Sequence, residues 1–168
     1  TDYVAGYSGQ IVDTPNPSYY TAMGVMQAIR AATEHKLGSS ELENKSILVK
    51  GIGNVGRFLV NYLSESNANI YVTDINKKRL DQISAAYPVN IVEPEKIFDH
   101  TYDIICPCDT DFLVTYQNVN KIRTEIIVGA TNNQLESADL AENLLQNNVL
   151  FCPGFLVNAG GLICVTKL

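Results

Sequence analysis

The spacing of apolar residues predicts one long helix followed by an alternation of strands and helices. From Pro17 to Leu37 apolar side chains recur every three or four residues, with Asn16 or Ser18 as the N-cap and Gly38 as the stop. Short β-rich runs follow, most of them separated by helical patterns. They lie at residues 46–50, 69–73, 89–92, 103–106, 125–129 and 149–151. This alternation predicts a mostly parallel sheet.

Two of the runs are apolar at successive positions, Ile104-Ile105-Cys106 and Ile126-Ile127-Val128. A strand of this kind is covered on both faces, so we expect helices on both sides of the sheet and the leading helix packed against it. The turn at residues 38–40 is the one plausible boundary. We therefore interpret residues 1–168 as one domain with a leading segment and helix, 1–38.

Composition narrows the function classes. The 168 residues are 46% hydrophobic and 18% charged, enough for one core, and the net charge of −6 without a Lys/Arg block argues against nucleic-acid binding. Cysteines 106, 108, 152 and 164 follow neither a secreted disulfide pattern nor zinc spacing, so a reducing cytoplasm and no metal are expected. No apolar run approaches the roughly 20 residues of a membrane span, and no signal-peptide pattern opens the chain.

A glycine-rich motif carries the chemistry. Gly51-Ile52-Gly53-Asn54-Val55-Gly56 follows the first strand and opens an amphipathic helix. In this context the first glycine permits the tight turn, the second lets a pyrophosphate approach, and the third lets helix and strand pack closely. The pattern predicts an α/β fold of the Rossmann type, doubly wound, with strand order 3-2-1-4-5-6.

The acid that ends the second strand indicates the cofactor. Asp74, followed by Ile75, stands 18 residues after Gly56, where a carboxylate can accept hydrogen bonds from an adenosine ribose. This favours NAD over NADP, although the basic run Lys77-Lys78-Arg79 could meet a 2′-phosphate. The alternative is that the glycines only form a turn and that Asp74 caps the next helix.

Four further stretches resemble the glutamate/leucine/phenylalanine/valine dehydrogenase family, and leucine and phenylalanine dehydrogenases in particular. They are Pro17–Val25 (PSYYTAMGV), Ile105–Cys108 (ICPC), Gly129–Leu135 (GATNNQL) and Pro153–Gly161 (PGFLVNAGG). The resemblance extends over essentially the whole chain. It implies that this is the NAD-binding domain of an amino-acid dehydrogenase.

The resemblance also implies roles for single residues. Thr21 is expected near the nicotinamide amide, Pro107 and Cys108 beside the adenosine, Asn132 on the nicotinamide ribose and Asn158 at the nicotinamide end. Thr21 could instead be an ordinary helix-surface residue. Asn132-Asn133 after a strand could be only a turn.

The chain departs from the family pattern in two places. Asp109-Thr110-Asp111-Phe112 replaces the family's Ala-x-Gly-Gly, which places two carboxylates near the expected adenosine edge. Gly154 stands where the family has an aspartate.

In the resembled enzymes an L-amino acid is oxidatively deaminated to a 2-oxo acid and ammonium, with a lysine as base in a preceding domain. No lysine here lies in a matching context, so we expect no catalytic residue in this chain, a missing N-terminal catalytic domain, and an inactive fragment. We expect the longer protein to be a homo-oligomer. By resemblance Leu162 and Val165 line the substrate pocket, and their apolar side chains favour an apolar amino acid; a role in the core is the alternative.

Two other functions remain open on these residues. Another Rossmann oxidoreductase would share the glycine motif, but it has no reason to carry Asn132-Asn133-Gln134-Leu135. A non-enzymatic NAD-sensing or assembly module would explain a domain without the lysine base.

Overall fold

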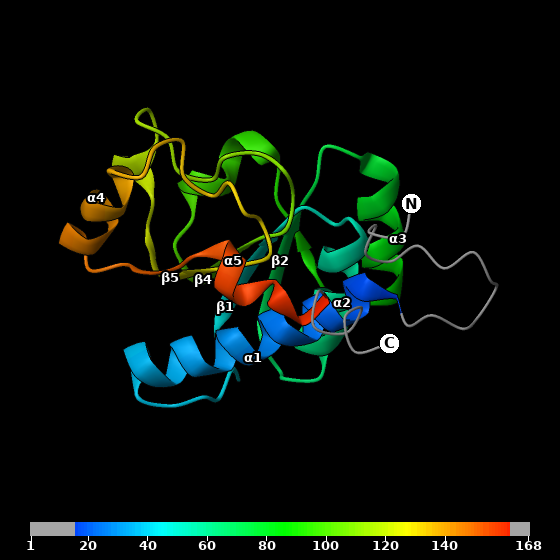
Figure 1. Cartoon of the computed structure of the whole chain (residues 1–168). Coiled ribbons are helices and arrows are strands. Elements are labelled where there is room, and N and C mark those ends of the chain that lie inside the picture. The colour runs from blue at the N-terminus through cyan, green and yellow to red at the C-terminus, as the bar shows by residue number, and fades with distance from the viewer. Residues whose placement is uncertain (1–15, 162–168) are drawn as a thin grey trace, which may run out of the picture.

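A parallel sheet of six strands forms the centre of the molecule (Figure 1), in a computed structural model that describes residues 16–161. The strands run in the order β3-β2-β1-β4-β5-β6, and every neighbouring pair is parallel. They are β1 (Ser46–Lys50), β2 (Asn69–Thr73), β3 (Asn90–Ile91), β4 (Tyr102–Pro107), β5 (Thr124–Val128) and β6 (Leu150–Cys152). The predicted doubly wound α/β fold and its strand order are confirmed.

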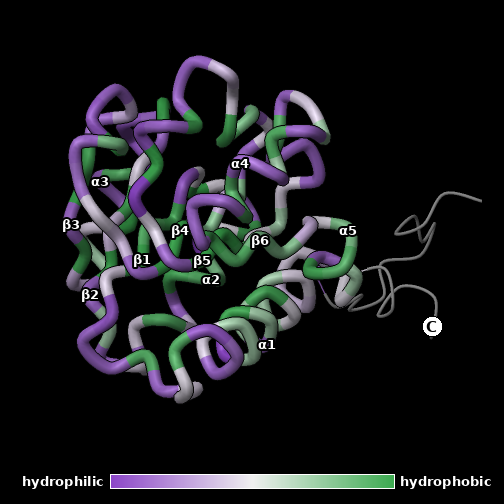
Figure 2. Tube along the Cα trace, turned by 90° about the vertical axis from the view of Figure 1, so that its left-hand side faces the viewer, coloured by the Kyte–Doolittle hydropathy of each residue, from purple (hydrophilic) through white to green (hydrophobic). Residues whose placement is uncertain are grey.

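The pleat of β1 divides the core into two layers. Ile47 and Val49 pack into one buried cluster and Leu48 into the other, and all three are fully buried. This follows from the alternation of side chains along a strand, so a strand at the sheet centre must be apolar on both faces. Figure 2 shows hydrophobic segments gathered in the middle of the molecule and hydrophilic ones in the outer loops.

Three α-helices cover the first face: α1 (Pro17–Leu37), α2 (Asn54–Ser64) and α3 (Lys77–Ala86). The Asn16 side chain accepts the N–H of Ser18, and Gly38 ends α1 in the left-handed conformation at φ 80°. The predicted bounds of this helix and its packing against the sheet are both confirmed.

The second face carries less regular structure. Its cover consists of two 3-10 helices, η1 (Pro94–Asp99) and η2 (Val119–Lys121), a loop that buries Leu113 and Val114, and α4 (Leu140–Gln146). The connection from β4 to β5 therefore crosses without an α-helix. Strand β3 is also shorter than predicted, because only Asn90 and Ile91 pair with β2 at this exposed edge.

A short helix, α5 (Gly154–Val157), follows β6 and lies against α1 (Figure 1). Two glycines allow this contact: a Cβ on Gly24 would lie 3.2 Å from the Val157 carbonyl oxygen, and one on Gly160 would lie 2.5 Å from that of Tyr20. Among residues 16–161, no helix combines the length and apolar character needed to cross a membrane.

Candidate functional site

The turn from β1 into α2 is held by two glycines that cannot carry side chains. Gly51 has φ +95°, and a Cβ there would lie 2.7 Å from the Asp109 Cβ. A Cβ on Gly56 would collide with the carbonyl oxygen of Gly51. The first and third glycines of the motif therefore serve the turn and the close approach of helix and strand, as the sequence predicts.

The middle glycine faces open space. No heavy atom lies within 4 Å of a Cβ built on Gly53. Gly53 is the N-cap of α2 and supplies no side-chain cap, so the first-turn N–H groups, which include those of Asn54 and Val55, have no side-chain acceptor at the cap. Unpaired N–H groups and the positive end of a helix dipole attract phosphate oxygens. This cradle fits a pyrophosphate.

Asp74 connects the end of β2 to the glycine turn. Its Oδ2 accepts the N–H of Ile52 at 2.7 Å, and its Oδ1 accepts the N–H of Asn76 at 2.7 Å. The Arg79 guanidinium lies 3.6 Å from Oδ2, and the Asp74 side chain is only 4% exposed. Each carboxylate oxygen retains a second acceptor position. The structural role that was weighed against ribose binding is therefore observed at Asp74.

A cavity of about 320 Å³ lies beside Asp74 at the carboxyl edge of the sheet. In parallel α/β folds ligands bind at this edge, where the strand order reverses, which here is between β1 and β4. The lining residues come from the glycine turn, the end of β2 and the segment after β4. They are Gly51, Gly53, Asp74, Ile75, Arg79, Cys108, Asp109, Thr110 and Asp111.

Asp109, one of the two carboxylates that depart from the family pattern, forms an ion pair with Lys50, a residue that the sequence analysis did not single out. Lys50, the last residue of β1, donates a hydrogen bond to Asp109 Oδ2, and the two side chains are 15% and 24% exposed. Burial raises the pKa of the Asp109 carboxyl, and the Lys50 ammonium lowers it in part. In the sequence the two partners of this ion pair are 59 residues apart. The only signal for the pair was a lysine directly before the glycine motif and an acid directly after Pro107-Cys108.

Pro107 and Cys108 lie at the end of β4, next to this cavity. Pro107 is buried, and its carbonyl oxygen accepts the N–H of Thr131 at 3.1 Å. Cys108 lines the cavity, and burial raises the pKa of its thiol to about 12. Cys106, Cys108 and Cys152 are free thiols, and the part of the chain that the structure describes has no His/Cys/Asp/Glu group suited to a metal.

The asparagines expected at the nicotinamide end lie together. Asn158 donates from Nδ2 to the Ala130 carbonyl oxygen at 2.9 Å and to Asn132 Oδ1 at 2.6 Å. Thr21 donates its hydroxyl to the Pro17 carbonyl oxygen at 3.0 Å, a bond within α1, and its Oγ1 faces Gly161. Leu162 and Val165 lie outside the described residues.

The buried Gln134 was not singled out as a positioning residue. Its Nε2 donates to the carbonyl oxygens of Gly129 at 3.4 Å and Cys152 at 3.5 Å, which joins the ends of β5 and β6. The family resemblance around Asn132 was the signal that could have marked it.

The sheet order and the glycine turn define an α/β protein of the Rossmann class. The model of the Glutamate/Leucine/Phenylalanine/Valine dehydrogenase family matches residues 17–78 and 70–167. The chain belongs to this family.

Individual relatives agree with this family assignment. Leucine dehydrogenase of Bacillus subtilis (strain 168) is 34% identical over 165 residues, which are 98% of this chain and 45% of that protein. L-tryptophan dehydrogenase of Nostoc punctiforme is 32% identical over 166 residues, 98% of this chain and 46% of the relative. The crystal structure of L-tryptophan dehydrogenase from that organism superposes with a TM-score of 0.87 at 32% identity, over 90% of this chain and 46% of that one. The chain thus spans about half the length of these relatives.

Proposed function

We propose that this chain is the NAD-binding domain of a dehydrogenase that oxidatively deaminates an apolar L-amino acid to a 2-oxo acid and ammonium. One observation carries the proposal. The open, uncapped start of α2 at Gly53 and the Asp74 carboxylate border the same cavity at the carboxyl edge of the sheet. A dinucleotide needs this combination, because its pyrophosphate seeks N–H donors and its ribose seeks an acceptor.

Each half of the dinucleotide has residues to hold it. The turn Gly51–Gly56 would hold the pyrophosphate, Asp74 the adenosine ribose, and Ile75, Pro107 and Cys108 the adenosine walls. Asn132 and Asn158, whose amides bond each other, would orient the nicotinamide ribose, with Thr21 nearby. Bound NAD supplies a hydride acceptor. The Lys50–Asp109 pair leaves the adenosine cavity with less net negative charge than the sequence alone suggests.

The proposal places the catalytic base outside these 168 residues. A base must reach the substrate amine, and the ammonium groups of Lys36 and Lys50 are engaged elsewhere. Lys50 pairs with Asp109, and Lys36 donates to the Asn148 carbonyl oxygen at 2.5 Å. The relatives are about twice as long as this chain, which leaves room for a catalytic domain. We extend the proposal to a homo-oligomeric, cytoplasmic enzyme.

Direct cofactor binding tests the core of the proposal. We expect calorimetric titration of the chain with NAD to give one binding site per chain. A chain that folds, as judged by circular dichroism, and yet shows no binding of NAD or NADH would refute the assignment.

A further inference from the structure

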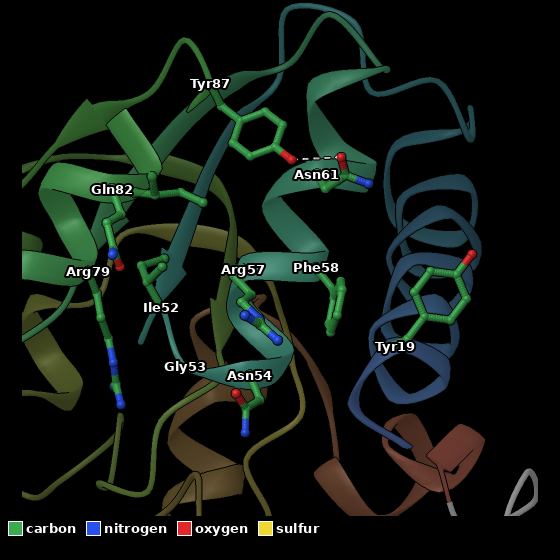
Figure 3. A pocket seen from close by; sticks show the side chains of 11 residues that line it. Tyr19, Ile52, Gly53, Asn54, Arg57, Phe58, Asn61, Arg79, Gln82 and Tyr87 are labelled. Carbon is green, nitrogen blue, oxygen red and sulfur yellow. Dashed lines mark hydrogen bonds between the residues drawn. The ribbon is translucent and has the colours of Figure 1, made fainter. Parts of the chain in front are cut away.

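A second and larger cleft lies between α2 and α3, next to the glycine turn (Figure 3). Its volume is about 760 Å³, and residues of α1, α2 and α3 line it. The side chains that matter to its chemistry are Tyr19, Asn54, Arg57, Asn61, Arg79 and Tyr87. The proposed cofactor role uses only one edge of this cleft, at Gly53 and Asn54 of the glycine turn.

Helical spacing puts the polar side chains into one space. On α2, Asn54, Arg57 and Asn61 are three and four residues apart and so share a face; on α3, Arg79 and Gln82 do the same. All five line the cleft. In Figure 3 the side chains of α2 and α3 approach the cleft from its two sides.

The cleft is electropositive. Two guanidinium groups and the start of α2 border it, and its lining contains no carboxylate. Arg57 has no ion-pair partner among residues 16–161 and lies over the Phe58 ring, 4.8 Å from its centroid. Arg79 is half exposed and contacts Asp74 at 3.6 Å. The planar fork of N–H donors on an arginine guanidinium matches the geometry of a phosphate group.

Aromatic rings form the other walls. Tyr19 is 39% exposed and meets Phe58 edge-on at 5.6 Å between ring centroids. Tyr87 is fixed across the cleft because its hydroxyl donates to Asn61 Oδ1 at 2.8 Å (Figure 3). Exposed and positioned aromatic faces suit a flat ring.

The hydrogen bond between Ile52 and Asp74 lies between this cleft and the 320 Å³ cavity proposed for the cofactor. The two spaces share only Gly53 and Arg79. Asp74 lines the smaller cavity but not the cleft, and it accepts the N–H of Ile52, which lines the cleft but not the cavity. An occupant of the cleft would therefore sit behind the glycine turn and leave the adenosine position free.

We propose that this cleft is a second binding site, for a phosphate ester that carries a planar ring, and that it is occupied together with NAD. Arg57 and Arg79 supply the donors for the phosphate, and the aromatic residues that line the cleft supply the contacts for the ring. The inference goes beyond the cofactor site and does not depend on dehydrogenase activity.

Calorimetry at saturating NAD tests the second site, with AMP as the probe. We expect one AMP per chain. Adenosine, which lacks the phosphate, and glycerol 2-phosphate, which lacks the ring, should each bind at least about tenfold more weakly, which is 1.4 kcal/mol. Arg57→Gln should weaken AMP by a similar factor and leave NAD affinity unchanged. Arg123→Gln, an exposed arginine away from the cleft, is the matched control and should change neither.

Two results would overturn the inference. In the first, NAD displaces all AMP, so that the two ligands share one site. In the second, Arg57→Gln weakens NADP but not AMP, which would make the cleft the 2′-phosphate position of the cofactor itself. Absence of NAD binding would refute the cofactor proposal alone. The second site could still be tested, because the effect of Arg57→Gln on AMP affinity can be measured without NAD.

Discussion

The carboxylate of Asp74 and the backbone N–H of Ile52 are joined by a hydrogen bond of 2.7 Å, which ties the end of β2 to the glycine turn. The acid that would recognise the ribose also holds the turn that would bind the pyrophosphate. Ligand contact and local structure therefore depend on the same side chain.

The first prediction concerns cofactor preference. The chain should bind NAD more tightly than NADP, because the Asp74 carboxylate accepts from a ribose diol and repels a 2′-phosphate. Asp74→Ala should weaken NAD and relax the preference by about 1–3 kcal/mol, the range for removing one side of a charged hydrogen bond. Calorimetric titration with both cofactors measures this, with the exposed Asp81→Ala on α3 as control. Equal or tighter NADP binding by the unaltered chain would contradict it.

Two glycine substitutions should separate binding from folding. Gly53→Ala places a methyl group in open space, so stability should hold within about 1 kcal/mol while NAD affinity falls, because the methyl occupies the pyrophosphate position. Gly56→Ala drives a methyl group into the Gly51 carbonyl and should cost about 1–3 kcal/mol of stability, the range for overpacking. Urea unfolding followed by circular dichroism, together with NAD titration, distinguishes them. Equal losses of stability in both variants would be inconsistent with the geometry.

The Lys50–Asp109 pair predicts a pH-dependent variant. Burial raises the pKa of Asp109, so its contribution to stability is present below the ordinary aspartate pKa and is lost as pH rises through the raised value. Lys50→Met removes the ammonium group that lowers the pKa of Asp109. In this variant the pKa of Asp109 is therefore higher, and stability continues to fall up to a higher pH. At pH 7 the variant should be less stable by about 1–3 kcal/mol.

This deficit should shrink toward pH 4, where a protonated Asp109 needs no partner. Urea unfolding at pH 4 to 8 gives the profile. The double variant Lys50→Met/Asp109→Asn is the matched control and should recover most of the loss at pH 7. A deficit that is constant across this pH range would rule out Asp109 as its cause.

The chain alone should not turn over amino acids. The proposed base lies outside it, and Lys50 is held by Asp109. NADH absorbance should stay at the blank rate with leucine, valine, phenylalanine and glutamate. Turnover with any of them would show that a base is present within these 168 residues.

The longer protein should prefer branched-chain or aromatic amino acids to glutamate. Leu162 and Val165, three residues apart in sequence and outside the described residues, offer only methyl groups, which reward apolar contact and leave a γ-carboxylate without a donor. One methylene is worth only about 1–3 kcal/mol, so several aliphatic substrates should be accepted. Comparison of kcat/KM across the four amino acids measures the preference. A best value with glutamate would mean that a polar group from elsewhere reaches the pocket.

The sequence predicted what local signals encode. The bounds of α1 follow from Asn16 and Gly38, and the glycine turn follows from its own motif. The shortness of β3 did not follow, because pairing with β2 decides it. Contacts between distant segments could not be predicted from the sequence. The Lys50–Asp109 pair joins the ends of β1 and β4, and only the positions of α2 and α3 in the fold bring Arg57 and Arg79 to one cleft.

Helix α1 packs against β5 and β6, although it precedes them by most of the chain. During synthesis this helix emerges before β5 and β6, so part of the surface it packs against does not exist until residues 124–152 have emerged. Most of the stability of a helix in a protein comes from the tertiary packing of its apolar face. The contact of α1 with β5 and β6 should therefore form later in folding than its contact with α2, and in nascent chains that end before β5 residues 17–37 should be less protected from proteases than in the complete fold.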